Sequence, residues 1–144
     1  MVARDASAVD AERLSRSLLP RVSRTFALGI KLLPSKLEPP VRLGYLLCRI
    51  ADTIEDDLAL PPTRKAELLD AFLHCFDDAR EADAFGPAAA GTLTANPDYL
   101  ELVEANGAVF QIYRGLDAPT QAILRRWVEA VSYTHLTLPT ILRV

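Results

Sequence analysis

Apolar residues recur every three or four positions along most of this chain, which is the spacing of helices with one buried face. No segment before residue 131 shows the strict alternation of a half-buried strand. We therefore predict an all-α helical bundle of six helices joined by loops, the longest being "FGPAAAGTLTAN", 85–96. The predicted helices cover residues 8–19, 23–33, 38–58, 62–83, 96–116 and 117–131.

Capping residues and prolines set the expected helix boundaries. Ser23 and Asn96 stand where N-cap residues are favoured. Pro20 and Pro34 are expected to end the first two helices, because proline lacks the backbone N–H that a helix interior needs. The third helix is expected to open at residues 38–40, "EPP", since proline is tolerated in a first turn.

The helical pattern breaks after Val131. Residues 132–144, "SYTHLTLPTILRV", alternate threonine with apolar residues and would form a strand without a partner. The run is similar to translated sequencing adapters at the ends of unrelated predicted proteins. We therefore divide the chain into a native domain, residues 1–131, and a suspected non-native tail, residues 132–144, which is left out of the fold. A genuine C-terminal extension is the alternative.

The 144 residues suffice for one domain, with half of them apolar and a net charge of −3. No basic run suggests nucleic acid, so we expect no nucleic-acid partner. The N-terminus lacks the apolar core of a signal peptide, and no apolar run reaches the ~20 residues of a membrane span. We expect a cytoplasmic protein with two free thiols, Cys48 and Cys75, and leave a peripheral membrane contact open.

A charged stripe runs along the predicted third helix. Tyr45, Arg49, Asp52 and Asp56 are spaced four, three and four residues apart. At about 100° per residue they share an arc of roughly 60°. The opposite side of the helix is apolar and built to pack, with Leu43, Leu46, Leu47, Ile50 and Ile54.

The charged stripe has two interpretations. A solvated outer face is the simpler one. Three details favour a binding site instead: the stripe holds no lysine, Arg49 lies within one turn of Asp52, and the acids gather at the C-terminal end of the helix. The helix dipole disfavours negative charge at that end, so clustered carboxylates there suggest a bound cation.

Magnesium fits this acid pattern better than other metals. Asp52 and Asp56 are one turn apart and offer oxygen ligands, and Mg²⁺ commonly completes its shell with water and phosphate oxygens. A calcium-binding loop is absent, and zinc would need histidine or cysteine nearby. With Arg49 beside the acids, the pattern suits a diphosphate carried by Mg²⁺.

Two stretches together resemble a known enzyme family. "DTIEDD", 52–57, which follows "YLLCR", 45–49, after two residues, and "SRTFALGIKLLP", 23–34, resemble motifs of the squalene and phytoene synthases. These are head-to-head prenyl transferases of the all-α isoprenoid synthase fold. The resemblance covers roughly residues 12–131 and implies that the chain is the N-terminal half of such a fold.

The resemblance also implies roles for residues of the DTIEDD stretch. Asp52 and Asp56 match the Mg²⁺ ligands, with Glu55 as a third oxygen donor, and Arg49 matches an arginine that meets the diphosphate. Asp57 points about 140° away from Asp52, so we expect it to be solvated or to support the ligands.

Further positions match residues around the substrate. The resemblance places Ser23 and Arg24 at the mouth of the diphosphate site and Phe26 at the border of the substrate channel. It places Tyr45 near the reacting carbons, so that Tyr45 and Arg49 are the expected catalytic residues.

The implied reaction joins two prenyl diphosphates, C15 or C20, through a cyclopropyl intermediate. Squalene synthases then reduce it with NADPH, whereas phytoene and dehydrosqualene synthases remove a proton. "DTIEDD" resembles the squalene form more closely, so farnesyl diphosphate and squalene are favoured. The chain length and the oligomeric state stay open.

One part of the family pattern is not found. The second aspartate-rich motif has no match in residues 58–131, and "FDDARE", 76–81, follows the first too closely and is expected to be a solvated face. We therefore expect the chain alone to be inactive and poorly stable. Two alternatives remain: a single-substrate isoprenoid cyclase, and a non-catalytic helical module that binds a basic partner through its acids.

Overall fold

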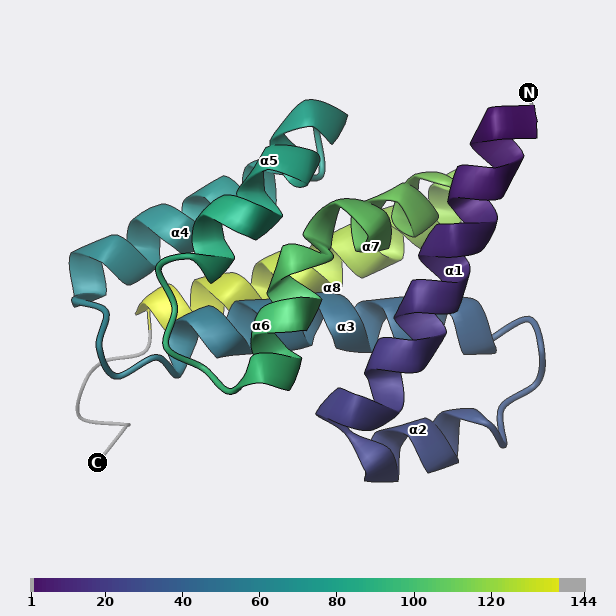
Figure 1. Ribbon diagram of the computed structural model, residues 1–144, viewed down its shortest axis with the longest axis horizontal. Coiled ribbons are helices and arrows are strands. Elements are labelled where there is room, and N and C mark those ends of the chain that lie inside the picture. The colour runs from purple at the N-terminus through teal and green to yellow at the C-terminus, as the bar shows by residue number, and fades with distance from the viewer. Residues whose placement is uncertain (1, 138–144) are drawn as a thin grey trace.

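The computed structural model describes residues 2–137, and describes side chains within residues 7–132. This part of the chain is all-α, as predicted, and contains no strand (Figure 1). Its helices are α1 (Val2–Val22), α2 (Arg24–Ile30), α3 (Glu38–Glu55), α4 (Pro62–His74), α5 (Ala79–Ala90), α6 (Pro97–Glu104), α7 (Asn106–Arg114) and α8 (Ala118–Thr137).

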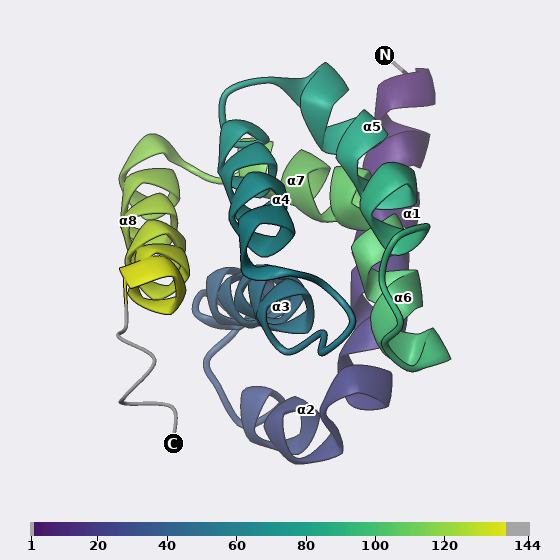
Figure 2. The same ribbon diagram turned by 90° about the vertical axis from the view of Figure 1, so that its left-hand side faces the viewer.

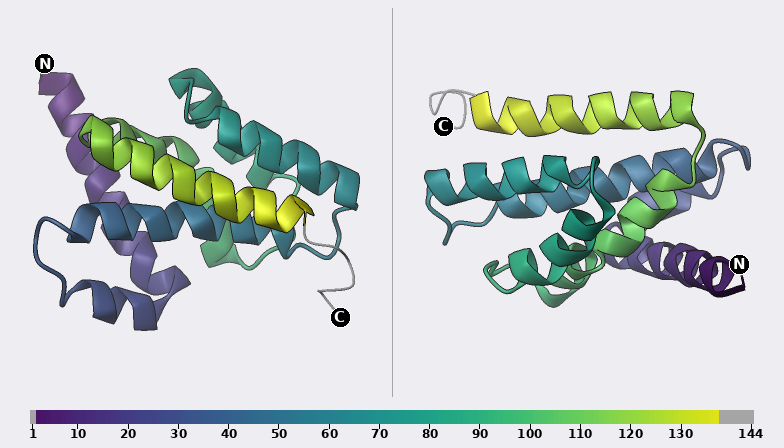
Figure 3. Two further views of the ribbon diagram at one scale, coloured as in Figure 1. Left: turned by 180° about the vertical axis from the view of Figure 1, so that it is seen from behind. Right: turned by 90° about the horizontal axis from the view of Figure 1, so that it is seen from above.

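Helix α3 is the centre of the fold. It packs against α8 and α4 on one side and against α1, α6 and α7 on the other. Figure 2 shows these groups as successive layers, with α2 alone at the lower end of the molecule. Seen from behind and from above, α8 covers α3 and α4 as an outer layer (Figure 3).

The apolar face of α3 is buried as its spacing predicts. Leu43, Leu46, Leu47, Ile50 and Ile54 are all fully buried. An aromatic cluster extends the core beneath α4 and α7, where the rings of Phe76 and Phe110 meet edge to face at 4.9 Å. The periodicity of the sequence therefore located the inner side of α3 correctly.

Pro20 does not end α1, contrary to prediction, because the helix continues to Val22. A proline inside a helix removes one hydrogen bond. The residues around it offset that loss by packing: Leu18, Leu19 and Val22 are all buried in the core.

The predicted helix over 62–83 and the predicted loop over 85–96 are both wrong. Helix α4 ends at His74, and α5 begins at Ala79. The side chain of Asp78 caps α5 by accepting hydrogen bonds from the amides of Arg80 and Glu81. The first half of the predicted loop, residues 85–90, belongs to α5, because buried Ala82, Phe85, Gly86 and Ala89 form a packing face.

Apart from Phe76, which is buried in the aromatic cluster, the "FDDARE" segment is exposed, as expected of a solvated face, and its two aspartates have structural partners. Asp77 accepts hydrogen bonds from Arg125 of α8 at 2.6 and 3.0 Å. Asp78 is the N-cap of α5.

The predicted helix over 96–116 is two helices, α6 and α7, which meet at Ala105. The bend lets α5 approach both of them closely. A Cβ atom on Gly86 of α5 would lie 2.6 Å from the carbonyl oxygen of Glu104, and one on Gly107 of α7 would lie 3.1 Å from the Cα of Asp83. The side-chain amide of Asn106 in α7 also donates a hydrogen bond to the carbonyl oxygen of Ala82 in α5 at 3.0 Å.

Gly86→Ala is expected to destabilise the fold by about 1–3 kcal/mol, because the new methyl group would push against the α6 backbone. Alanine normally stabilises a helix relative to glycine by up to about 1 kcal/mol. Gly29→Ala in α2 is the control, since a Cβ there meets nothing within 4 Å. Urea unfolding of both variants checks this; equal shifts would show that helix propensity, not packing, decides.

The break expected at residue 132 is also wrong, since α8 continues to Thr137. Residues 132–137 contain no glycine or proline, so the helical hydrogen bonds can continue through them. Residues 138–144, with Pro139, lie outside the described residues. The division of the chain at Val131 stays a prediction. No described helix combines the length and the apolar composition that a bilayer crossing needs.

Candidate active site

An apolar groove of about 570 Å³ lies between α2, the first half of α3 and α8. Phe26 of α2 and Tyr45 of α3 stack in it with ring centroids 4.1 Å apart and an interplanar angle of 20°. The structure thus brings together Phe26, which the resemblance assigns to the border of the substrate channel, and Tyr45, which it assigns near the reacting carbons. Other residues that line this apolar groove are Val41, Cys48, Ile123 and Trp127.

The α8 side of the apolar groove was missed by sequence reasoning. Ile123 and Trp127 line it and are 69% and 63% exposed. They are four residues apart, so they share one helix face. The buried face of this helix is formed by Leu124 and Val128, so Ile123 and Trp127 are large apolar residues outside that face. Their position was the signal in the sequence that could have indicated a second apolar surface.

A smaller polar hollow of about 320 Å³ lies beside the C-terminal half of α3. Arg49 and Asp56 of the charged stripe line it together with Tyr99 of α6. The guanidinium carbon of Arg49 lies 4.1 Å from the centroid of the Tyr99 ring, a cation–π contact that sequence reasoning also missed.

Arg49 keeps unused hydrogen-bonding capacity within this polar hollow. Its Nε atom is buried and has no hydrogen-bond partner in the part of the chain whose side chains are described. Buried donors are nearly always paired, and a guanidinium suits phosphate oxygens in particular. An anion in the polar hollow would satisfy this donor.

The three predicted metal ligands lie at the end of α3. Asp52 is half-buried, Glu55 is 9% exposed, and Asp56 is exposed and forms the C-cap of the helix. The last turn of α3 contains no basic residue, so negative charge gathers at the negative end of the helix dipole. Such a site favours an added cation.

The acids at this helix end do not form a ready set of three metal ligands. Among the described residues, no group of three His, Cys, Asp or Glu side chains is placed to hold a metal ion. Mg²⁺ often takes only one or two protein carboxylates and fills its shell with water and substrate phosphates. The assignment of Asp52, Glu55 and Asp56 to Mg²⁺ stays a prediction.

Ser23 and Arg24 lie at the start of α2. The Oγ atom of Ser23 accepts a hydrogen bond from the amide of Phe26 at 3.1 Å and caps the helix, as its position predicts. Arg24 is exposed in the first turn. Their role at the mouth of a diphosphate site stays a prediction.

Asp57 is buried and ties α3 to the segment before α6, so it is not the solvated group that was one expectation. Its carboxylate accepts hydrogen bonds from the amide and hydroxyl of Thr94 at 2.6 and 3.0 Å and from the amide of Ala59 at 2.9 Å. Burial raises the pKa of Asp57, but these hydrogen bonds and the charge of Lys65 outweigh it and lower the pKa below its ordinary value.

Asp57→Asn is expected to destabilise the protein by about 1–3 kcal/mol at pH 7, because the amide NH₂ would face the donors of Thr94. A carboxyl group with a lowered folded-state pKa stabilises the fold above its unfolded pKa of about 3.9, and this contribution is lost as the pH falls through the folded value. Urea unfolding at pH 7 and pH 3 should therefore show the difference between Asp57→Asn and the original protein shrinking in acid. A difference that is constant with pH would contradict a role for the charge.

Both cysteines are free thiols. Burial raises the pKa of Cys48 to about 11, with the nearby charge of Asp52 as a second cause. Burial raises the pKa of Cys75 to about 12. Cys48 therefore lines the apolar groove as a protonated thiol and not as a nucleophile.

Comparisons with known proteins agree with the motifs. The profile of the family described as Squalene/phytoene synthase matches residues 19–134. Botryococcus squalene synthase of Botryococcus braunii is 34% identical over 110 residues, which are 75% of this chain and 21% of that protein. Lycopaoctaene synthase of the same organism is 30% identical over 115 residues, 78% of this chain and 23% of that protein.

A squalene synthase of Nicotiana benthamiana is 44% identical over 62 residues, 42% of this chain and 15% of that protein. No solved structure matches the chain. The chain spans about a fifth of the length of the first curated relatives that it matches. Because the family profile covers most of the chain, this chain belongs to the squalene/phytoene synthase family.

Proposed function

We propose that this chain forms part of a Mg²⁺-dependent prenyl transferase that joins two prenyl diphosphates head to head, with farnesyl diphosphate as the favoured substrate. The observation that carries the proposal is the layout of α3. One helix presents an apolar groove at Tyr45 and Cys48 and a polar hollow at Arg49 and Asp56. A substrate with an apolar chain and a charged diphosphate needs both.

The apolar groove supplies the environment for the prenyl chain. Phe26, Tyr45 and Trp127 would enclose the chain and keep water away from the carbon that loses the diphosphate. Tyr45 lies in contact with Phe26, so its ring is held in one orientation. The protonated thiol of Cys48 offers no strong nucleophile to the reacting carbon.

The polar end of α3 supplies the groups for the diphosphate. Asp52 and Asp56, with Glu55 as a third donor, would hold Mg²⁺, and the unpaired Nε of Arg49 would donate to a diphosphate oxygen. Mg²⁺, when bound, would stabilise the charge that develops on the departing diphosphate. Ser23 and Arg24 are proposed to lie at the mouth of this site.

Squalene is the favoured product. The "DTIEDD" form of the motif and the names of several relatives, which are squalene synthases, support this choice over phytoene or dehydrosqualene. NADPH would then be the reductant, and no residue of this chain is assigned to it.

The test begins with resequencing of the source DNA across codon 131. The protein encoded by the complete reading frame is then incubated with farnesyl diphosphate, Mg²⁺ and NADPH, and its products are identified by mass spectrometry. We expect squalene, no product when Mg²⁺ is removed by chelation, and no product from the 144-residue chain alone. A second incubation replaces farnesyl diphosphate with geranylgeranyl diphosphate.

Two outcomes would overturn the proposal. If neither a C15 nor a C20 diphosphate gives a C30 or C40 product, the chain is not part of a head-to-head transferase. If a cyclic product forms from one substrate molecule, the cyclase alternative replaces it. Mg²⁺-independent binding of a basic protein through Asp52 and Asp56, without any product, would favour the non-catalytic module.

A further inference from the structure

Basic residues are concentrated in one segment of this acidic chain. Residues 13–37 contain six Lys and Arg residues and no Asp or Glu, although the whole chain has a net charge of −3. The segment runs from the middle of α1 through α2 to the turn before α3. In Figure 2 α2 lies at the lower end of the molecule, apart from the layers above it. The remainder of the chain is therefore strongly acidic.

Most of these cations are exposed and are not neutralised by neighbouring acids. Arg16 pairs with Glu38, and Arg21 pairs with Asp98. Among the described side chains, the other four cations have no ion pair with an acid, and all of them are exposed: Arg13, Arg24, Lys31 and Lys36.

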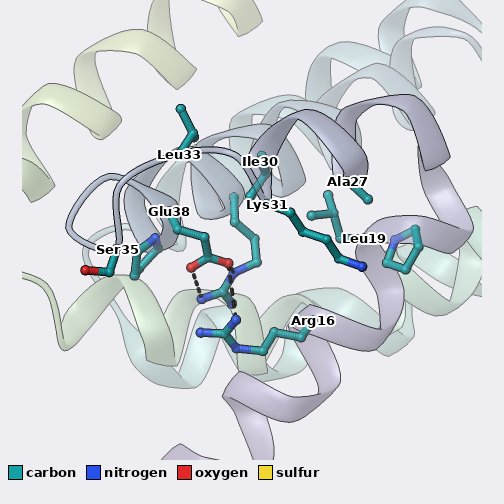
Figure 4. Close-up of a pocket in the computed structure, with 11 residues that line it drawn as sticks. Arg16, Leu19, Ala27, Ile30, Lys31, Leu33, Ser35 and Glu38 are labelled. Carbon is teal, nitrogen blue, oxygen red and sulfur yellow. Dashed lines mark hydrogen bonds and ion pairs between the residues drawn. The ribbon is translucent and has the colours of Figure 1, made fainter.

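Lys31 lines a hollow of about 550 Å³ between α1, α2 and the start of α3 (Figure 4). Glu38 is the one acid among the described residues that line it. Its carboxylate is already engaged by Arg42 at 2.8 Å and by Arg16 at 3.4 Å. Lys31 therefore adds positive charge to this end of the molecule.

Large apolar side chains lie among these cations. Leu28, Leu32 and Leu37 are 60%, 87% and 50% exposed. Ala27 and Ile30 form the buried side of α2. Leu28 lies four residues after Arg24 and three before Lys31, so the leucine shares the outer face of α2 with both cations. Exposed leucines grouped in this way mark an interaction surface.

We propose that this surface, formed by Leu28, Lys31, Leu32, Lys36 and Leu37, docks on an anionic lipid bilayer. The leucines would enter the boundary between head groups and acyl chains, and the cations would meet anionic head groups. Charge complementarity also fixes the orientation, because an anionic membrane attracts residues 13–37 and repels the acidic remainder of the chain.

Docking in this orientation has a consequence for the apolar groove. Phe26 and Leu37 line that groove, and Leu37 also belongs to the docking surface. The groove therefore opens next to the lipid, where an apolar molecule could enter it without crossing water. The docking itself does not depend on the proposed transferase activity.

Vesicle co-sedimentation of the 144-residue chain tests the docking. We expect binding to phosphatidylcholine vesicles that contain phosphatidylglycerol, weak binding to phosphatidylcholine alone, and release by salt. Lys31→Glu with Lys36→Glu is expected to weaken binding at least about 30-fold, from roughly fivefold for each lost cation. Leu28→Ser with Leu32→Ser is expected to weaken it about tenfold or more.

Matched controls distinguish the effect of this surface from the effect of losing any exposed cation or any exposed leucine. Arg80→Glu with Arg114→Glu removes two exposed cations elsewhere, and Leu58→Ser removes a leucine that is 97% exposed in the turn after α3. Both controls are expected to bind vesicles like the original chain. Circular dichroism of every variant confirms that the helices are retained.

Three results would overturn the proposal. The first is no binding to anionic vesicles. The second is equal weakening by the control variants, which would indicate unspecific adsorption. In the third, the variants of the docking surface leave vesicle binding unchanged but reduce self-association in analytical ultracentrifugation, which would make the surface a contact between copies of the chain. The product assay above is independent of each of these results.

Discussion

Replacing Asp52 and Asp56 together with asparagine is expected to lower product formation by the full-length enzyme on the order of 10²–10³-fold. Asparagine keeps the size of both side chains but removes the two negative charges that would hold Mg²⁺ at the end of α3. The acids lie in and beside the polar hollow where Arg49 has its unpaired Nε. Loss of the metal would leave the departing diphosphate without its main counter-charge.

Turnover of farnesyl diphosphate at a series of Mg²⁺ concentrations measures this effect. Glu67→Gln with Asp70→Asn is the control, since it removes two exposed acids from α4 and should leave turnover unchanged. Unfolding curves of both double variants show whether each protein is folded. Product formation that keeps its rate and its Mg²⁺ dependence after the loss of Asp52 and Asp56 would remove them from the metal site.

Arg42→Met is expected to destabilise the fold by about 3–5 kcal/mol. Arg42 is fully buried and donates to Glu38 and Glu12, each at 2.8 Å, and to the hydroxyl of Ser15. Methionine fills much of the space but removes the Arg42 donors from both carboxylates and from the hydroxyl, and leaves the carboxylates only the longer contacts with Arg16 at 3.4 and 3.5 Å. The loss of stability comes from the remaining polar groups, because removing one partner of a buried ion pair leaves the charge of the other uncompensated.

Urea unfolding measures the change, with Arg64→Met as the control. Arg64 forms a 2.9 Å ion pair with Glu67, and both side chains are largely exposed, so its loss should cost less than about 1 kcal/mol. Adding Glu12→Gln and Glu38→Gln to Arg42→Met is expected to restore part of the lost stability. Equal effects of Arg42→Met and Arg64→Met would show that the buried network contributes no more than a surface pair.

The sequence predicted those features of the fold that depend on local rules. The 3.6-residue period located the buried face of α3, where the five apolar residues expected to pack are all fully buried: Leu43, Leu46, Leu47, Ile50 and Ile54. Capping chemistry located the starts of α2 and α6, since the side chains of Ser23 and Asn96 accept the predicted hydrogen bonds. These signals act within one or two helical turns, so they can be recognised in the sequence without knowing which other helix packs nearby.

Sequence reasoning did not predict the breaks between α4 and α5 or between α6 and α7. The prediction of one helix over 62–83 treats Asp77 and Asp78 as part of the helical pattern and misses the capping-box spacing of Asp78 and Glu81, which marks the start of α5. The bend at Ala105 accompanies a tertiary contact, the close approach of Gly86 to the carbonyl of Glu104. Helix crossing geometry decides such contacts, and a single sequence does not contain it.

The candidate site divides in the same way. The motifs pointed to Phe26, Tyr45 and Arg49, and the structure stacks the first two and places the third in the polar hollow. Tyr99 and Trp127 come from α6 and α8 and reach the site only through packing. Periodicity indicates which face a residue occupies, but not which helix lies opposite.

The buried network around Arg42 also bears on the order in which the protein can fold during synthesis. All its groups, from Glu12 to Arg42, are present early, so α1 and the start of α3 can join while later residues are still being added. Leu124 and Val128, the buried residues of α8, are made several seconds later at about 5–20 residues per second. During that interval the side of α3 that α8 will cover is open to the solvent around the ribosome. A nascent chain stalled before α8 is therefore a natural client for chaperones that bind exposed apolar helices.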